Sequence, residues 1–335
     1  MKYSVSDIQK IIGAEWVLAT APRATVEQLL FDSRQIAAPT YSLFFALTGQ
    51  RHDGHRYLPD LYKAGVRHFV VSQTIDPAQY PEANILRVEN TLEALQKLAA
   101  FHRAQFDIPV VGITGSNGKT VVKEWLYQLL APDFHIVRSP KSYNSQIGVP
   151  LSVWQMRPEH TLALFEAGIS KPGEMQHLAG IIQPKIGVFT NIGPAHREGF
   201  RNDEEKIREK MRLFDSARVL VVCADQPAVL AEAQAWQGAQ EGRQLFTWST
   251  GGQPADVQVI GIQPISGDFL QIRAAFRQMV ELGVVDIPFS DPASLENAIH
   301  CWAVLHLLGV SQKNIAERMR RLEPVEMRLE LKSGI

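Results

Sequence analysis

Ile108-Pro-Val-Val-Gly-Ile-Thr-Gly-Ser-Asn-Gly-Lys-Thr120 is the stretch of sequence that decides the fold of this chain. Its apolar first half predicts a buried strand over Val110–Thr114, and a glycine-containing loop follows that ends at Lys119 and Thr120. A helix is predicted directly after the loop, because apolar residues recur on one face at Val121, Val122, Trp125, Leu126, Leu129 and Leu130.

A strand, a glycine loop and a helix N-terminus in this order indicate a phosphate-binding loop. Backbone N–H groups and the positive helix end attract an anion, the lysine reaches its outer phosphates, and the threonine hydroxyl can hold Mg²⁺. The general P-loop pattern is matched imperfectly, since its first glycine falls on Ile113 while the chain has Gly112 and Gly115. ATP is favoured over GTP because the sequence has no NKxD motif for guanine. The predicted nucleotide contacts are Thr114, Gly115, Ser116, Asn117, Gly118, Lys119 and Thr120.

Apolar segments that alternate with helical patterns follow this loop. The predicted strands are His135–Arg138, Leu162–Ala167, Ile186–Thr190 and Val219–Cys223. Near-continuous apolar strands separated by helices predict a mainly parallel sheet that is covered on both faces. From Leu245 to Ile287 the short runs separated by glycines favour antiparallel strands or hairpins. A last helix covers Leu295 to His306, and Gly309 suits its C-terminal end.

The residues before the loop predict a separate small α/β unit. Its expected strands are Leu43–Leu47, His68–Val71 and Ile85–Val88. Asn90, followed three residues later by Glu93, resembles a helix-capping box. We therefore expect four segments: an N-terminal domain over 1–88, a linker helix over 89–107, a central domain over 108–321 and a hinge stub over 322–335.

Composition excludes several classes of protein. The 335 residues carry 34 basic and 35 acidic side chains, so bulk charge gives no support for binding to nucleic acid. No apolar run approaches the ~18–20 residues that span a bilayer, and the N-terminus has no apolar signal core. Two distant cysteines, Cys223 and Cys301, suggest a reduced compartment. We expect a cytoplasmic protein without a membrane span.

This loop and the motifs around it resemble those of the Mur ligases, which are ATP-dependent amide-forming enzymes of peptidoglycan synthesis. Within that family the resemblance is greatest to the MurF type. The motifs that carry the resemblance are Thr114–Thr120, Asn144–Pro150 (NSQIGVP), Glu166–Gly168 with Pro172–Glu174, Thr190–His196 (TNIGPAH), and at the front Asp32–Arg34, Phe44–Gly49 and Asp53–His55. They come in the family's order and cover nearly the whole chain.

The resemblance implies a UDP-sugar-binding N-terminal domain and a central P-loop ATPase domain. In the implied reaction, ATP phosphorylates the terminal carboxylate of UDP-N-acetylmuramoyl-tripeptide to an acyl phosphate. The amine of D-alanyl-D-alanine then attacks, and phosphate leaves. ATP and Mg²⁺ are the implied cofactors. Since negative oxygens must be brought together, catalysis rests on positioning and charge neutralisation.

By the same resemblance, five residues are catalytic: Lys119, Asn144, Glu166, His196 and Lys210. Thr120, Glu166 and His196 would hold Mg²⁺, together with Lys210 as a carbamate formed with CO₂. Asn144 would bond the γ-phosphate or the acyl phosphate.

Further binding residues are implied at both ends of the chain. Asn297 would read adenine, although Glu296 and His300 depart from the family's HNxxN pattern there. Asp225, after Cys223, is expected to be a helix cap or a hinge near the nucleotide. The expected UDP-sugar contacts are Ser33, Arg34, Gly49 and His55.

Other interpretations stay open from the sequence alone. A MurE-type ligase, a folylpolyglutamate synthase and a non-catalytic nucleotide- or UDP-sugar-binding module share parts of the pattern. The chain reaches a hinge-like segment, Leu322–Leu329, and we expect a C-terminal ligase domain to be absent from it, so that it has little or no turnover alone. The segments NSQIGVPLSVW and ENAIHCWAVL also resemble MurF ligases fused to an alanine racemase.

Overall fold

In a computed structural model of the chain, the structure describes residues 2–32, 34, 36–49, 52–193, 199–277 and 282–325. The chain divides into two compact units. The first comprises Met1–Asp107 and Gln146–Pro158, and the second comprises Ile108–Ser145 and Glu159–Ile335. The prediction assigned Gln146–Pro158 to the central domain, and it treated residues 89–107 as a linker. Both segments instead belong to the first unit.

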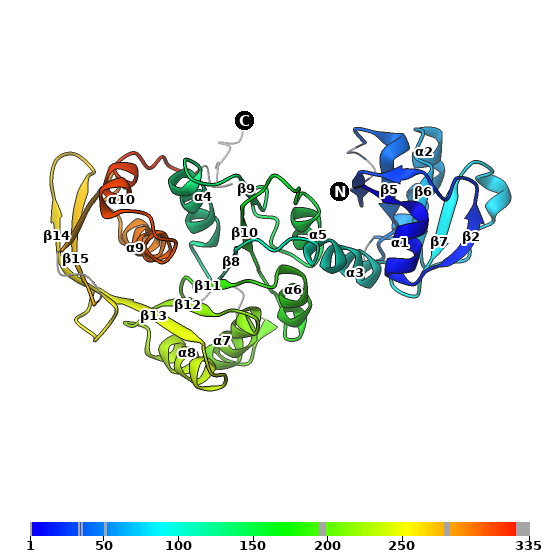
Figure 1. Cartoon of the computed structure of the whole chain (residues 1–335). Helices are drawn as coiled ribbons and strands as arrows, with labels where there is room; N and C mark the ends of the chain where they lie inside the picture. The colour runs from blue at the N-terminus through cyan, green and yellow to red at the C-terminus, as the bar shows by residue number, and fades with distance from the viewer. Residues whose placement is uncertain are drawn as a thin grey trace, which may run out of the picture. The chain divides into compact units, whose positions relative to one another are not determined.

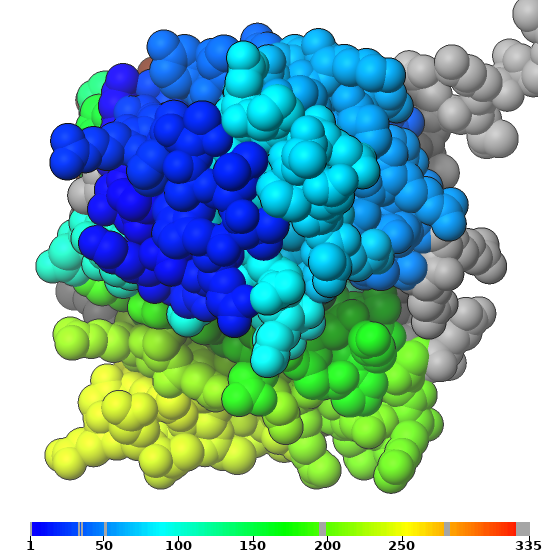
Figure 2. All heavy atoms as spheres, turned by 90° about the vertical axis from the view of Figure 1, so that its right-hand side faces the viewer, coloured from blue at the N-terminus to red at the C-terminus, as the bar shows by residue number. Residues whose placement is uncertain are grey.

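The first unit contains a five-stranded sheet in the order β2-β7-β6-β5-β4 (Figure 1). Four neighbouring strands, β4 to β7, are parallel, and β2 runs antiparallel to β7 at the edge. Figure 2 shows one face of this unit, where the blue atoms of early residues adjoin the cyan atoms of later ones. The strands are β2 (Glu15–Ala19), β4 (Gln28–Leu30), β5 (Ser42–Phe45), β6 (His68–Val71) and β7 (Asn84–Arg87), with a separate ribbon of β1 (Tyr3–Ser4) and β3 (Thr25–Val26).

Helices cover both faces of this sheet because its side chains alternate between two apolar cores. Leu43 and Phe45 face one core and Phe44 faces the other. The helices are α1 (Val5–Ile12), α2 (Leu58–Lys63), α3 (Thr91–Arg103) and α5 (Gly148–Val153), with short 3₁₀ turns at Pro39–Tyr41, Gly54–Tyr57 and Pro77–Gln79. Asn90 caps α3 as predicted, since its Oδ1 accepts from the backbone N–H of Leu92 at 3.0 Å.

The second unit is built on one nine-stranded sheet in the order β16-β15-β14-β13-β12-β11-β8-β10-β9. Strands β8 to β14 pair in parallel, and β14, β15 and β16 form the predicted antiparallel part along one side. The prediction was wrong for β13, which pairs in parallel with both of its neighbours. The strands are β8 (Val110–Thr114), β9 (Ile136–Arg138), β10 (Leu162–Glu166), β11 (Ile186–Phe189), β12 (Val219–Cys223), β13 (Gln244–Ser249), β14 (Val257–Pro264), β15 (Leu270–Phe276) and β16 (Gly283–Ile287).

Helices lie on both faces of this sheet as well (Figure 1). Helices α4, α9 and α10 pack on one face in a single apolar core with Trp125, Trp248 and Trp302. The helices are α4 (Lys119–Leu130), α6 (Glu174–Ile182), α7 (Asp203–Met211), α8 (Pro227–Gly238), α9 (Pro292–Leu307) and α10 (Gln312–Met319), with a 3₁₀ turn at Arg212–Phe214. In the described ranges, no helix has the length and apolar character needed to cross a membrane. Most of the predicted hinge, residues 326–335, lies outside the described residues.

Trp154 ties the segment after α5 to the first unit. Its indole Nε1 donates to the Glu27 carbonyl at 3.0 Å, and its ring contacts Tyr3 and His102. The hydroxyl of Tyr3 lies 3.0 Å from His102 Nδ1. Burial keeps His102 neutral, lowering its pKa to about 4.

We expect Trp154→Ala to lower the free energy of unfolding of the first unit by about 3–5 kcal/mol, because a large buried ring and its hydrogen bond are removed. Hydrogen exchange should show faster opening of β5 to β7 but not of β8 to β12. Tyr41→Ala is the control, since Tyr41 is an exposed aromatic residue. Equal loss of protection in both units would contradict this assignment of the segment.

Candidate functional site

The loop between β8 and α4 has a conformation that its two glycines make possible. Gly115 has φ 143° and Gly118 has φ 80°, values that residues with a side chain rarely adopt. A Cβ atom at Gly115 would overlap Thr190 Oγ1, and one at Gly118 would overlap Asn297 Oδ1. The loop therefore depends on glycine at both positions, for its backbone angles and for close packing.

The segment after β11 holds this loop in place. Thr190 Oγ1 donates to the Asn117 carbonyl at 2.6 Å, and the Asn117 N–H donates to Asn191 Oδ1 at 3.0 Å. The Ser116 N–H donates to the Asn191 carbonyl at 2.8 Å. Residues of the predicted TNxGxxH motif thus shape the loop. His196, the last residue of that motif, lies outside the described residues.

Lysine side chains converge on the carbonyl groups of the loop. Lys119 Nζ donates to the carbonyls of Gly115 and Ser116 at 3.0 and 3.1 Å, and Lys210 Nζ donates to Gly115 O at 3.0 Å. Lys206 Nζ donates to the Gly193 carbonyl at 2.7 Å. Burial, with Lys119 and Lys206 nearby, lowers the pKa of Lys210 to about 7. Such a group of ammonium ions suits a polyanionic ligand.

Glu166 ends strand β10 and faces the first turn of α4. Thr120 Oγ1 donates to Glu166 Oε2 at 2.9 Å. The carboxylate is fully buried, and among the described residues its other oxygen, Oε1, has no hydrogen-bond partner. Burial raises the pKa of Glu166, while Lys123 and Thr120 act against that rise. An unpaired carboxylate oxygen beside a threonine hydroxyl fits a hard cation such as Mg²⁺.

Asn144 reaches the same edge of the sheet from the loop after β9. Its carbonyl accepts from the Gly168 N–H at 2.8 Å, two residues beyond Glu166. Its side chain lies against Gly168, where an added Cβ would come within 3.0 Å of Asn144 Cγ. The structure thus places Asn144 beside the segment that carries Glu166.

Asn297 lies on α9 against the loop, as the contact with Gly118 shows. The two departures from the family pattern on this helix both have partners. Glu296 bonds the side chain of Asn191. His300 Nδ1 accepts from Trp248 Nε1 at 3.1 Å and His300 Nε2 faces the Thr190 carbonyl at 2.9 Å. Burial lowers the pKa of His300 to about 4, so a neutral histidine bridges the sheet and the loop.

Asp225 is not the predicted helix cap. The N-cap of α8 is Gln226, and the Asp225 carboxylate instead accepts from Ser249 Oγ at 2.6 Å and the Thr250 N–H at 2.7 Å. Although burial opposes it, these bonds keep the pKa of Asp225 low. Asp225 stabilises the turn that follows β13.

The predicted UDP-sugar contacts follow the parallel strands of the first unit. Arg34 is exposed and pairs with Asp32 at 2.8 Å. His55 Nδ1 donates to Asp53 at 2.7 Å, while its Nε2 accepts from the Ser72 N–H at 3.0 Å. The Gly49 N–H donates to the His52 carbonyl at 2.7 Å, and Ser33 lies outside the described residues. His55 therefore orders its loops, and Arg34 and Arg56 are exposed cations beside them.

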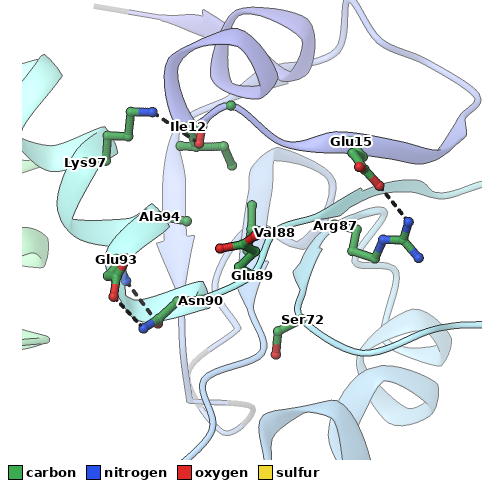
Figure 3. Close-up of a pocket in the computed structure, with 11 residues that line it drawn as sticks. Ile12, Glu15, Ser72, Arg87, Val88, Glu89, Asn90, Glu93, Ala94 and Lys97 are labelled. Atoms are coloured by element: carbon green, nitrogen blue, oxygen red, sulfur yellow. Dashed lines mark hydrogen bonds and ion pairs between the residues drawn. The ribbon is translucent and has the colours of Figure 1, made fainter.

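A separate hollow of the first unit, of about 560 Å³, is lined by residues of α1, β7 and the start of α3 (Figure 3). Its two cations already have partners: Lys97 Nζ donates to the Ile12 carbonyl at 3.5 Å, and Arg87 pairs with Glu15 at 2.6 Å. Since Glu93 adds negative charge, the hollow has mixed character and we assign it no ligand.

Sequence reasoning missed one buried cation near the site. Lys123 is fully buried one turn after Lys119, and its Nζ donates to the Ser139 carbonyl at 2.7 Å. The sequence pattern does not reveal this burial, because a lysine beside Val122 on an amphipathic helix is expected to be solvated. The carbonyl groups that surround it come from a distant loop.

Two family models match the sequence. One is described as "Mur ligase middle domain" and matches residues 113–301, and the other as "Mur ligase family, catalytic domain" and matches residues 25–103. The UDP-N-acetylmuramoyl-tripeptide--D-alanyl-D-alanine ligase of Bacillus subtilis is 27% identical over 99% of this chain. MurF from Acinetobacter baumannii has a TM-score of 0.87 at 25% identity over 98% of this chain. MurF from Thermotoga maritima, solved in complex with ADP, has a TM-score of 0.76 at 24% identity over 90% of this chain.

The chain is shorter than these relatives. It covers 69% of the Bacillus ligase, 70% of the Acinetobacter MurF chain and 67% of the Thermotoga chain. Two further ligases with the same name, from Synechocystis and Treponema pallidum, match over 37% and 41% of their lengths.

We expect Gly115→Ala to lower the free energy of unfolding by about 1–3 kcal/mol or more, because the new methyl group meets Thr190 at a strained φ. Gly180→Ala is the matched control. Gly180 lies inside α6 with open space around it, so alanine should stabilise the helix by about 0.5–1 kcal/mol. Urea unfolding measures both values, and a neutral Gly115→Ala would contradict the described loop.

Proposed function

The chain belongs to the Mur ligase family, and from that premise we propose that it carries the nucleotide and UDP-sugar sites of a MurF-type ligase. Such a ligase joins D-alanyl-D-alanine to UDP-N-acetylmuramoyl-tripeptide at the expense of ATP. The observation that supports this most directly is the cluster around the loop. Lys119 and Lys210 both donate to the Gly115 carbonyl, and Thr120 donates to the buried Glu166. The 27% identity to a ligase of that name, over 99% of this chain and 69% of that ligase, supports the MurF type.

Each residue of the cluster has a role in this proposal. Lys119 leaves the loop carbonyls and binds the outer phosphates of ATP, while the loop N–H groups hold the inner ones. Thr120 and Glu166 would hold Mg²⁺ with His196, and the ion supplies charge neutralisation between phosphates. Asn144 bonds the γ-phosphate and orients it toward the tripeptide carboxylate. Asn297, beside Gly118, contacts adenine.

Lys210 takes part as a carbamate in this proposal. Its amine nitrogen attacks the carbon of CO₂, forming an N–C bond and releasing a proton to solvent. The resulting anion can serve as a metal ligand, whereas an ammonium ion would repel the metal. Burial of the amine supports this role, because it favours the neutral, nucleophilic form.

The acceptor distinguishes the MurF type from the MurE type. We expect this chain to bind UDP-N-acetylmuramoyl-tripeptide more tightly than the corresponding dipeptide, measured by isothermal titration. Arg34 and the ordered loop at His55 support binding of the UDP group in the first unit. Tighter binding of the dipeptide would favour the MurE type, and binding of neither would overturn the UDP-sugar site.

The two buried free cysteines are consistent with a reduced, cytoplasmic setting.

We expect Lys119→Ala to weaken Mg²⁺-dependent ATP binding by roughly 10- to 100-fold, because one charge-assisted phosphate contact is worth about 1.5–3 kcal/mol. Titration calorimetry measures the affinity. Lys171→Ala is the control, since Lys171 is an exposed lysine of the same unit. Unaltered affinity in Lys119→Ala would defeat the phosphate-loop assignment.

We expect a carbamate carbon signal in NMR spectra when the chain is held in ¹³C-bicarbonate. The signal should grow as the pH rises through about 7, because the Lys210 amine loses its proton there. It should vanish in Lys210→Met and persist in Lys171→Met. Persistence in Lys210→Met would assign the modification to another lysine.

A further inference from the structure

Lys123 is a fully buried cation that the roles assigned above do not use. We propose that Lys123 is a positioning residue, whose ammonium group sets the loop over residues 139–144 and so places the Asn144 side chain for the γ-phosphate. This inference rests on the proposed function, because it takes nucleotide binding and the role of Asn144 as given. It adds to that function the role of Lys123, which acts through Asn144.

The contacts of Lys123 point to the loop rather than to a ligand. Its Nζ donates to the Ser139 carbonyl at 2.7 Å and also to the Lys141 carbonyl. Its third neighbour is Glu124 Oε1 at 3.0 Å. Three acceptors match the three N–H donors of an ammonium group. Two of them are backbone carbonyls of one short loop, so the charge fixes the path of that loop.

The loop leads directly to Asn144 through tight backbone contacts. Lys141 has φ 52°, a value that residues with a side chain rarely adopt. The Asn144 N–H donates to the Ser142 carbonyl at 2.8 Å, and the Asn144 carbonyl accepts from Gly168 at 2.8 Å. A shift of the carbonyls at 139 and 141 would therefore move Asn144 relative to the segment that follows Glu166.

Ser139 links the same ammonium group to strand β10. Its N–H donates to the Leu164 carbonyl at 3.1 Å, and its Oγ lies 3.4 Å from the Glu166 N–H. Ser139 is fully buried. One residue held by Lys123 thus contacts the strand that carries Glu166, while the loop beyond it carries Asn144.

Arg138 holds Glu124, the third partner of the Lys123 ammonium group, in position. Arg138 Nε donates to Glu124 Oε2 at 2.9 Å, and the Arg138 guanidinium lies 3.5 Å from the centre of the Tyr127 ring. Both Glu124 and Tyr127 belong to α4, the helix that begins at the phosphate loop. The network therefore ties the start of α4 to the end of β9. Burying a charge is costly unless it is fully paired, which favours a positional role over simple packing.

The test compares a non-hydrolysable ATP analogue with ADP, both with Mg²⁺, by titration calorimetry. We expect Lys123→Met to weaken binding of the analogue by roughly 10- to 100-fold more than binding of ADP, because the γ-phosphate contact is made only with the analogue, whereas the loss of positive charge near Glu166 acts on both ligands. A reduced folded fraction would affect both ligands equally, so the ratio of the two affinities reports positioning. Lys123→Arg, which keeps charge and donors, should lose selectivity in the same direction by a smaller factor.

A double-mutant cycle separates this role from general stability. Asn144→Ala alone should weaken binding of the analogue to a similar extent. Adding Lys123→Met to it should weaken that binding little further, because both changes remove the same γ-phosphate contact. Lys313→Met is the control: Lys313 is an exposed lysine of the same unit, so the ratio should not change. If Lys123→Met fails to fold, Lys123→Arg alone decides.

Two results have different meanings. An unchanged ratio of analogue to ADP affinity in the folded Lys123 variants, or additive losses in the cycle, would overturn the positioning role. Failure of the unaltered chain to bind either nucleotide would instead overturn the proposed function.

Discussion

The burial of lysine side chains at the carboxyl edge of the nine-stranded sheet is the constraint on which the second unit depends. Lys123, Lys206 and Lys210 are each at most 2% exposed. An ammonium group out of water is costly unless its N–H groups have acceptors. The acceptors here are backbone carbonyls, of Ser139 for Lys123, Gly193 for Lys206 and Gly115 for Lys210. Because carbonyls cannot move without their chain, burial of the lysines fixes the loops around the site.

The same constraint explains why small residues and polar partners are needed beside the lysines. Gly115 gives its carbonyl to both Lys119 and Lys210, and no side chain would fit between it and Thr190. Glu166 is fully buried, with one oxygen on Thr120 and the other without a partner among the described residues. The lysine side chains of the site donate to carbonyl groups of the protein's own loops.

Much of this arrangement could be predicted from the sequence. The strand Val110–Thr114 was predicted with its observed bounds, because an apolar run that meets a glycine loop leaves little freedom in where it ends. Glu166 was placed at a strand end for a similar reason, since the apolar run before it stops there. Local patterns of this kind depend on residues that are neighbours in the chain.

The remainder depends on contacts between distant segments, which spacing does not encode. The apolar pattern of α4 does not show that Lys123 is buried, because the carbonyls that contact it lie 16 and 18 positions later. Asp225 precedes a helix as a cap would, yet the backbone of the turn after β13 offers it more N–H groups. Trp154 belongs to the first unit because its partners, Glu27 and Tyr3, come from the start of the chain.

The departures from the family pattern on α9 bear on whether the nucleotide site is intact. His300 stands where the family has a second asparagine, and it bridges Trp248 and the Thr190 carbonyl. Thr190 in turn bonds the Asn117 carbonyl of the phosphate loop. A site that had lost its function would be free to lose such links, because nothing would require the loop to keep its shape. Here His300 instead contacts Thr190, which holds the loop, and this contact supports the proposed nucleotide site over a module that retains only the fold.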